Sequence, residues 1–152
     1  MDFRKITRKE EFQFSQEVAE DQLETLFRHY EIYEDEMGTE AEKQLFRMSY
    51  PKLVVAIRRG RLQILKEDDK LVIEQIVGKG DGPPIIYKEL SGSARIQDAS
   101  SGEMGESMEV ARNKRVYSLM GSLSGLGMSA MINLKGNDLS IMECLGFLFL
   151  ST

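Results

Sequence analysis

Apolar residues recur at every third or fourth position through much of the first 60 residues, which is the spacing of an amphipathic helix. This spacing predicts a first helix over residues 15–37. Thr39 followed three positions later by Glu42 has the pattern of a capping box, so we expect a short second helix to begin there. Pro51 can open a third helix, because the first turn of a helix does not use the missing N–H. Gly60 fits the position just after the end of that helix.

The period changes after residue 60 from helical spacing to short runs rich in Leu, Ile and Val. Residues 62–66 and 70–77 are two such runs joined by an acidic turn, and they predict a β-hairpin. Residues 85–90 predict a third strand. Three strands with one apolar face form a small antiparallel sheet that needs a helix to cover it.

Helical spacing returns in the last third of the chain. Residues 91–105 are rich in Ser and Gly, and we expect a mobile loop there. Further helices are predicted over residues 116–123 and 128–134, and a last one follows an N-cap at Asn137 or Asp138. The order of elements therefore predicts an α+β, helix-dominated fold, with N-terminal helices, a small three-stranded antiparallel sheet in the middle and C-terminal helices.

The length of the chain is that of one ordinary domain. A chain of 152 residues is long enough to bury one substantial core. We expect residues 1–152 to form a single domain. Within it, residues 1–60 form an acidic helical part, residues 61–90 the sheet and residues 106–152 a second helical part.

Composition argues against several classes of protein. Contents of 30% charged and 41% hydrophobic residues are typical of neither a disordered chain nor a membrane-embedded bundle. A net charge of −5 and an isoelectric point near 5.1 argue against a nucleic-acid-binding protein. The single Cys excludes an intrachain disulfide and a multi-thiolate metal site. The basic first residues are not followed by the apolar stretch of a secretory signal, so we expect a cytoplasmic protein without a membrane partner.

The residues that could carry chemistry fit structural roles better. Gly78, Gly80 and Gly82 have the look of a phosphate loop, but a predicted strand follows them where such a loop needs a helix. His29 could titrate near neutral pH, yet it lies beside an apolar stripe and is interpreted as a polar boundary residue. Cys144, between apolar neighbours, is interpreted as a buried, inert thiol. We therefore predict no catalytic residue, metal site or cofactor, and a protein that is not an enzyme.

Charged residues are unevenly distributed along the chain. Carboxylates crowd residues 17–36, where they form either a solvated helix face or a docking surface for a basic partner. Arg58, Arg59 and Arg61 form a basic cluster. Cations at the end of a helix are ordinary, so this cluster predicts no nucleic-acid partner.

Methionines are concentrated in the C-terminal third of the chain. Flexible thioethers fill irregular cores, but they also line surfaces that bind varied apolar segments of a partner protein. The same apolar faces could equally join copies of the chain in a homo-oligomer. The candidate partner-binding residues on these faces are Leu145, Phe147, Phe149, Met128 and Met131.

Short apolar and Gly-containing stretches follow one another in a recognisable order from residue 59 to the end. The stretches are Arg59-Gly60-Arg61-Leu62, Ile86-Tyr87-Lys88-Glu89-Leu90-Ser91-Gly92, Leu123-Ser124-Gly125-Leu126, Leu134, Asp138-Leu139 and Leu145-Gly146-Phe147-Leu148. This order resembles that of the tail assembly chaperones of long-tailed bacteriophages and prophages, although residues 1–50 are not matched. The resemblance implies a non-enzymatic chaperone that keeps tail-tube and tape-measure proteins soluble during virion assembly in the cytoplasm of a bacterial host.

Two other functions stay open on the sequence. A bacterial secretion-type chaperone, which wraps a disordered segment of an effector as a dimer, has a similar size, acidity and α+β character. A small enzyme would need His29 or a pair of carboxylates to converge with a nucleophile in one pocket.

Overall fold

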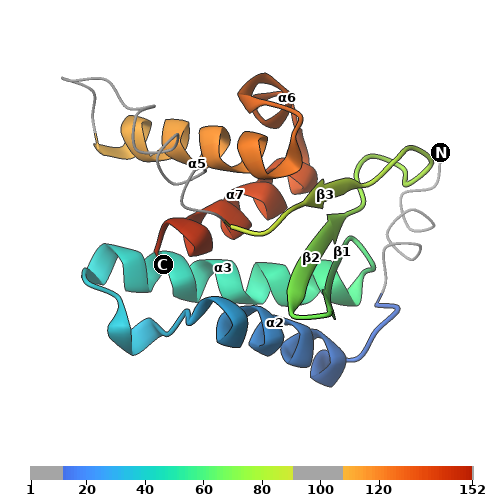
Figure 1. Ribbon diagram of the computed structural model, residues 1–152, viewed down its shortest axis with the longest axis horizontal. Coiled ribbons are helices and arrows are strands. Elements are labelled where there is room, and N and C mark those ends of the chain that lie inside the picture. The colour runs from blue at the N-terminus through green and yellow to red at the C-terminus, as the bar shows by residue number, and fades with distance from the viewer. Residues whose placement is uncertain (1–11, 91–107, 152) are drawn as a thin grey trace.

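The computed structural model describes residues 12–90 and 108–151. Its elements are α2 (Gln16–Tyr30), the 3-10 helix η1 (Glu34–Glu36), α3 (Glu40–Arg58), β1 (Leu62–Glu67), β2 (Lys70–Gln75), β3 (Ile85–Tyr87), α5 (Met108–Ser124), α6 (Met128–Ile132) and α7 (Gly136–Leu150) (Figure 1). The predicted fold class is confirmed: the fold is α+β and helix-dominated, with a small antiparallel sheet between N-terminal and C-terminal helices. The loop predicted over residues 91–105 lies outside the described residues.

The first helix is shorter than the predicted range of 15–37. It ends at Tyr30, because Glu31 adopts the left-handed conformation with φ 54°. The N–H of Ile32 then bonds back to the Phe27 carbonyl at 2.8 Å, as in a Schellman cap. This reversal places Ile32 in the core, where it is 3% exposed. The predicted continuation of the helix to residue 37 is therefore wrong.

The second and third predicted helices are one continuous helix, α3. It runs through Pro51, so the prediction that Pro51 opens a new helix is wrong. The proline removes one backbone hydrogen bond, but burial of an apolar face that includes Leu53 stabilises the helix on both sides of it. Both predicted ends are confirmed. Thr39 accepts a hydrogen bond from the Glu42 N–H at 3.1 Å, and Gly60 follows the last turn with φ 76°.

The three strands pair antiparallel in the order β1-β2-β3. Glu67 pairs with Lys70 at the end of the first hairpin, so the turn consists of Asp68 and Asp69 alone. Both turn residues have positive φ, at 49° and 65°, as the two-residue type I′ turn requires. The predicted hairpin with an acidic turn is thus confirmed.

The third strand is shorter than the predicted range of 85–90. It ends at Tyr87, because the next N–H, that of Lys88, bonds to the Leu123 carbonyl at 3.0 Å. Leu123 lies in the last turn of α5. The chain therefore leaves the sheet by attaching to a helix, which a strand pattern alone does not reveal.

The last helix starts without a side-chain cap. Its N-cap is Lys135, so the prediction that Asn137 or Asp138 caps it is wrong. The Asp138 carboxylate instead accepts a hydrogen bond from the Gly78 N–H at 2.9 Å. This bond ties the segment after β2 to the first turn of α7.

Helix α7 is the centre of the core. Figure 1 shows α7 passing between α5 and α3, while α2 lies on the other side of α3 and the sheet packs at one end of these helices. Seven of its fifteen residues are buried, which explains why apolar residues occur all round it. None of the described helices combines the length and the apolar character needed to cross a bilayer.

Two glycines allow the C-terminal helices to approach closely. A Cβ atom added at Gly146 of α7 would lie 2.5 Å from Cγ1 of Val116 in α5. A Cβ added at Gly121 of α5 would lie 2.5 Å from the backbone of Gly127 and Met128. We refer to these two contacts of α5, with α7 at Gly146 and with the start of α6 at Gly121, as the C-terminal seam. The helices can approach this closely because glycine has no Cβ atom at positions 121 and 146.

Most of the candidate partner-binding residues lie in the core. Met131 and Leu145 are 0% exposed and Phe149 is 2% exposed, so their side chains pack inside this chain. Of the two roles that the sequence left open for these apolar faces, the structure shows core packing for these three residues, and their candidacy for a partner surface is corrected. Phe147 and Met128 are half-buried and remain at the surface as candidates.

Candidate binding sites

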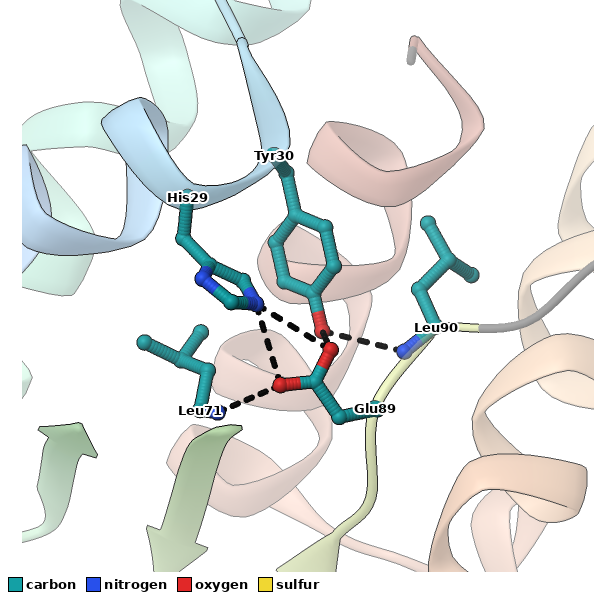
Figure 2. Close-up of polar contacts among 5 residues, drawn as sticks. All are labelled: His29, Tyr30, Leu71, Glu89 and Leu90. Carbon is teal, nitrogen blue, oxygen red and sulfur yellow. Dashed lines mark hydrogen bonds and ion pairs between the residues drawn. The ribbon is translucent and has the colours of Figure 1, made fainter. Parts of the chain in front are cut away.

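A polar network joins the end of α2 to two segments of the sheet region (Figure 2). Nε2 of His29 lies 3.0 and 3.1 Å from the two carboxylate oxygens of Glu89. The Tyr30 hydroxyl donates to Glu89 at 3.3 Å and accepts from the Leu90 N–H at 3.0 Å. The N–H of Leu71, in β2, also donates to Glu89. We call these five residues the Glu89 network.

The network favours an ionised Glu89. Burial on its own raises the pKa of this carboxyl, but the hydrogen bonds from Leu71, His29 and Tyr30 and the charge of His29 outweigh it, so the pKa lies below its ordinary value. Burial also raises the pKa of Tyr30 to about 12, and the neighbouring Glu89 charge acts in the same direction. Because an ionised carboxylate only accepts hydrogen bonds, His29 must carry a hydrogen on Nε2.

The geometry of the Glu89 network makes it a structural clamp. Both carboxylate oxygens of Glu89 already accept hydrogen bonds, and the His29 side chain is only 15% exposed. A carboxylate can orient a His that acts as a general base, but that role also needs a nucleophile hydrogen-bonded to the other nitrogen of the imidazole ring. Among the described residues, Glu89 is the hydrogen-bond partner of His29. The interpretation of His29 as a polar boundary residue agrees with this position. Nothing in the sequence indicated that its hydrogen-bond partner would be Glu89, 60 residues away.

A groove of about 470 Å³ lies between the C-terminal half of α3 and the first turns of α7, and we call it the α3–α7 groove. Its lining residues are Pro51, Lys52, Val55, Ala56, Arg59, Arg61, Asn137, Ser140 and Ile141. A smaller polar groove of about 190 Å³ shares Arg59, Arg61 and Asn137 with it and adds Lys135. The two grooves together are apolar along α3 and cationic at the end of the helix.

The predicted basic cluster is divided between this groove and another contact. Arg58 bonds to the Phe14 carbonyl at 3.3 Å and to Oε1 of Gln16 at 3.2 Å, and it stacks on Phe12. Arg59 and Arg61 line the α3–α7 groove instead. Arg58 and Arg59 are thus adjacent in the sequence but contact different parts of the molecule, which the clustering of charges in the sequence did not predict.

A second groove, of about 340 Å³, is lined by Phe147, one of the two candidates left at the surface. We call it the Phe147 groove; it lies between the first half of α3, the start of α5 and the end of α7. Leu45, Phe147 and Leu150 supply its large apolar side chains, and Glu42, Arg112 and Arg115 are its charged residues. An apolar floor with charged groups around it is the usual form of a site for a protein segment.

A third groove, of about 310 Å³, combines aromatic and acidic residues between α2, η1 and α3. Phe27 and Phe46, whose ring centroids are 5.3 Å apart, line it together with Tyr33. Its acidic residues are Glu24, Glu34 and Asp35. Two arginines already pair with this group, Arg28 with Glu24 and Arg47 with Glu34. Those pairs partly neutralise the acidic face predicted over residues 17–36.

The remaining candidates for chemistry lie apart from these grooves. Cys144 is 4% exposed, and burial raises the pKa of its thiol, in agreement with a buried, unreactive residue. Residues 12–90 and 108–151 contain no group of three or more His, Cys, Asp or Glu that could hold a metal ion. No family model, curated protein or solved structure matches this chain.

Proposed function

We propose that this protein is a non-enzymatic chaperone of phage tail assembly that works in the cytoplasm of a bacterial host. Its partner is an apolar segment of a tail-tube or tape-measure protein, and its role is to keep that segment from aggregating. The resemblance from residue 59 onward supports this proposal, and Leu145-Gly146-Phe147-Leu148 is one of the stretches that carry it.

The observation that carries the proposal is the position of Phe147. Within that stretch, Leu145 and Leu148 are buried in the core, but Phe147 lines a surface groove with Leu45 and Leu150. Burial of one large apolar side chain of a partner stabilises a complex by about 1.5 to 3 kcal/mol. A groove of about 340 Å³ has room for only a few such side chains. The expected complex is therefore reversible, as a chaperone requires.

The test measures, by titration calorimetry, the binding of a purified phage tail-tube protein and of segments of a tape-measure protein. Phe147→Ser should weaken binding about tenfold or more, because it removes the apolar floor of the groove. Leu45→Ser, on α3, should weaken it similarly without changing α7. Phe14→Ser is the matched control, since Phe14 is 45% exposed and does not line the groove.

Three results would contradict the proposal. The first is that neither tail protein binds the wild-type chain. The second is that Phe147→Ser and Leu45→Ser bind as tightly as Phe14→Ser does. The third is binding of a secreted effector by a tight dimer of this chain, which would identify a secretion-type chaperone instead.

A further inference from the structure

The α3–α7 groove concentrates positive charge in a chain whose net charge is −5. Lys52, Arg59 and Arg61 line it, and Lys135 lines the smaller groove that continues it. Among the described residues that line the two grooves, the one carboxylate is that of Asp138, in the smaller groove, and its Oδ2 already accepts the Gly78 N–H at 2.9 Å. The local field therefore attracts anions, although the molecule as a whole is acidic.

Arg59 has hydrogen-bonding capacity that the described part of the chain does not satisfy. Its Nε is buried and has no hydrogen-bond partner among residues 12–90 and 108–151. The centre of its guanidinium lies 5.9 Å from the Phe12 ring, which offers a stacking contact but no acceptor for that N–H. A buried donor of this kind is costly unless an acceptor reaches it. Arg59 also lines both grooves, so an acceptor bound there lies beside this residue.

The start of α7 adds to the same end of the groove. This helix has fifteen residues, and its N-cap, Lys135, makes no side-chain hydrogen bond to the first turn. Uncapped N–H groups and the helix dipole both favour an anion at this position. Asn137 and Ser140, in the first turns of α7, also line the groove and can donate hydrogen bonds.

The rest of the groove is apolar. Pro51, Val55 and Ala56 of α3 face Ile141 of α7 across it. Its volume of about 470 Å³ lies in the range of sites for small molecules. A bare inorganic ion would leave this apolar part unused, whereas a ligand with an apolar portion would fill it.

We propose that the α3–α7 groove binds a small organic phosphate. Its phosphoryl group contacts Arg59 and Arg61 beside the start of α7, and its apolar portion rests on Val55 and Ile141. Phosphate is favoured over a carboxylate because it carries a second negative charge and a third oxygen, and several cations converge at this end. This site is separate from the Phe147 groove and does not depend on the chaperone proposal.

Nuclear magnetic resonance titrations of the full chain with phenyl phosphate, inorganic phosphate and acetate test the proposal. Phenyl phosphate should bind most tightly and acetate most weakly, and the amide signals of Asn137 and Ser140 should shift. Arg59→Gln should weaken the binding of phenyl phosphate about tenfold or more, because a charge-assisted hydrogen bond is lost. Arg58→Gln is the matched control, since it removes the same charge one residue away but lines neither groove.

The outcomes separate this site from its alternatives. Loss of binding in Arg59→Gln with retention in Arg58→Gln supports the site, provided that the Arg59→Gln chain keeps its wild-type amide spectrum elsewhere. Equal loss in both variants would mean a diffuse attraction to positive charge and would overturn the proposal. Absence of shifts at Asn137 and Ser140 in the wild-type chain would overturn it without any variant. Phe147→Ser should leave phosphate binding unchanged, so failure of the chaperone proposal is distinguishable from failure of this one.

Discussion

The C-terminal seam and the Glu89 network stabilise the same fold by different kinds of contact. In the seam, Gly146 lies so close to Val116 that even a methyl group would collide with it. In the network, an ionised Glu89 accepts hydrogen bonds from His29, Tyr30 and Leu71, which belong to α2 and β2, segments far from it in the sequence. The first contact is steric and is insensitive to pH, whereas the second is electrostatic and titrates.

The two kinds of contact should be sensitive to different kinds of substitution. A close-packed seam responds to volume, because neighbouring atoms have nowhere to move. A polar network responds to the loss of an acceptor, and the response grows with burial. Effects of substitutions on stability should therefore decrease from the tightest steric contact to the most exposed charge pair.

The largest effect is expected for Gly121→Ala. The added Cβ would lie 2.5 Å from the backbone of Gly127 and Met128, which cannot rotate away as a side chain can. We expect the free energy of unfolding to fall by about 3 kcal/mol, at the upper end for overpacking. Urea denaturation followed by circular dichroism measures it.

Gly38→Ala is the control for this substitution. Nothing lies within 4 Å of a Cβ added at Gly38, so it should be nearly neutral. If Gly121→Ala were as stable as Gly38→Ala, the C-terminal helices would not be held by close approach. Steric sensitivity to added volume would then not distinguish the seam from the Glu89 network.

A smaller effect is expected for Tyr87→Phe, which removes one buried hydroxyl. That hydroxyl donates to Oε1 of Gln75 at 2.7 Å, and Gln75 is 0% exposed. Nε2 of Gln75 donates in turn to the Asp138 carbonyl at 2.8 Å, so Tyr87 and Gln75 together link the sheet to α7. Loss of the donor leaves a buried acceptor unsatisfied and should lower the free energy of unfolding by about 2 kcal/mol.

The loss of stability in Tyr87→Phe is measured by thermal unfolding, with Tyr33→Phe as the control. Tyr33 is 43% exposed, and loss of its hydroxyl should leave stability nearly unchanged. Equal melting temperatures for the two variants would show that burial does not set the strength of polar contacts in this protein.

A third effect, smaller but dependent on pH, is expected for Glu89→Gln. The side chain of Glu89 is 38% exposed, so solvent screens the network and the loss at neutral pH should be only about 1 kcal/mol. The folded-state pKa of Glu89 lies below its ordinary value of 4.5. Its contribution is therefore complete above pH 4.5 and is lost as the pH falls through the lower, folded-state value.

The pH dependence is read from urea denaturation at a series of pH values from neutral to acid. The wild-type chain should lose stability on acidification more steeply than Glu89→Gln, so the two curves approach each other at low pH. Glu74→Gln removes a carboxylate from the same region of the sheet, outside the network, and should retain the wild-type steepness. Equal acid sensitivity in all three proteins would refute the assignment of a titrating clamp to Glu89.

The elements that sequence could predict are those with local signals. Thr39 and Gly60 mark the two ends of α3, because a cap and a positive-φ glycine act within one turn of the helix. The turn at Asp68 and Asp69 is equally local. Where tertiary contacts decide, the prediction was wrong: Glu31 ends α2 without a glycine so that the next residue is buried.

The binding residues were harder to predict than the fold. Apolar spacing selected Leu145 and Phe149 with Phe147 but left both core packing and partner binding open as their role. In the structure α7 lies between α3 and α5, which buries Leu145 and Phe149 and leaves Phe147 half-buried. The α3–α7 groove was harder still to predict from the sequence. Arg59 and Lys135 are far apart in the sequence, and only the packing of α7 on α3 places both beside the smaller groove.

The smallest effect is expected at the exposed end of the comparison, for the ion pair between Arg28 and Glu24. These side chains are 72% and 54% exposed and lie four positions apart on α2. Such pairs contribute about 0.3 to 0.5 kcal/mol, because water and salt screen both charges. Arg28→Gln should therefore lower the free energy of unfolding by less than Glu89→Gln does, and 0.5 M salt should abolish the difference from wild type. A loss as large as that of Glu89→Gln would mean that exposed charges on α2 stabilise the fold as much as the partly buried network does, and burial would no longer explain the ranking.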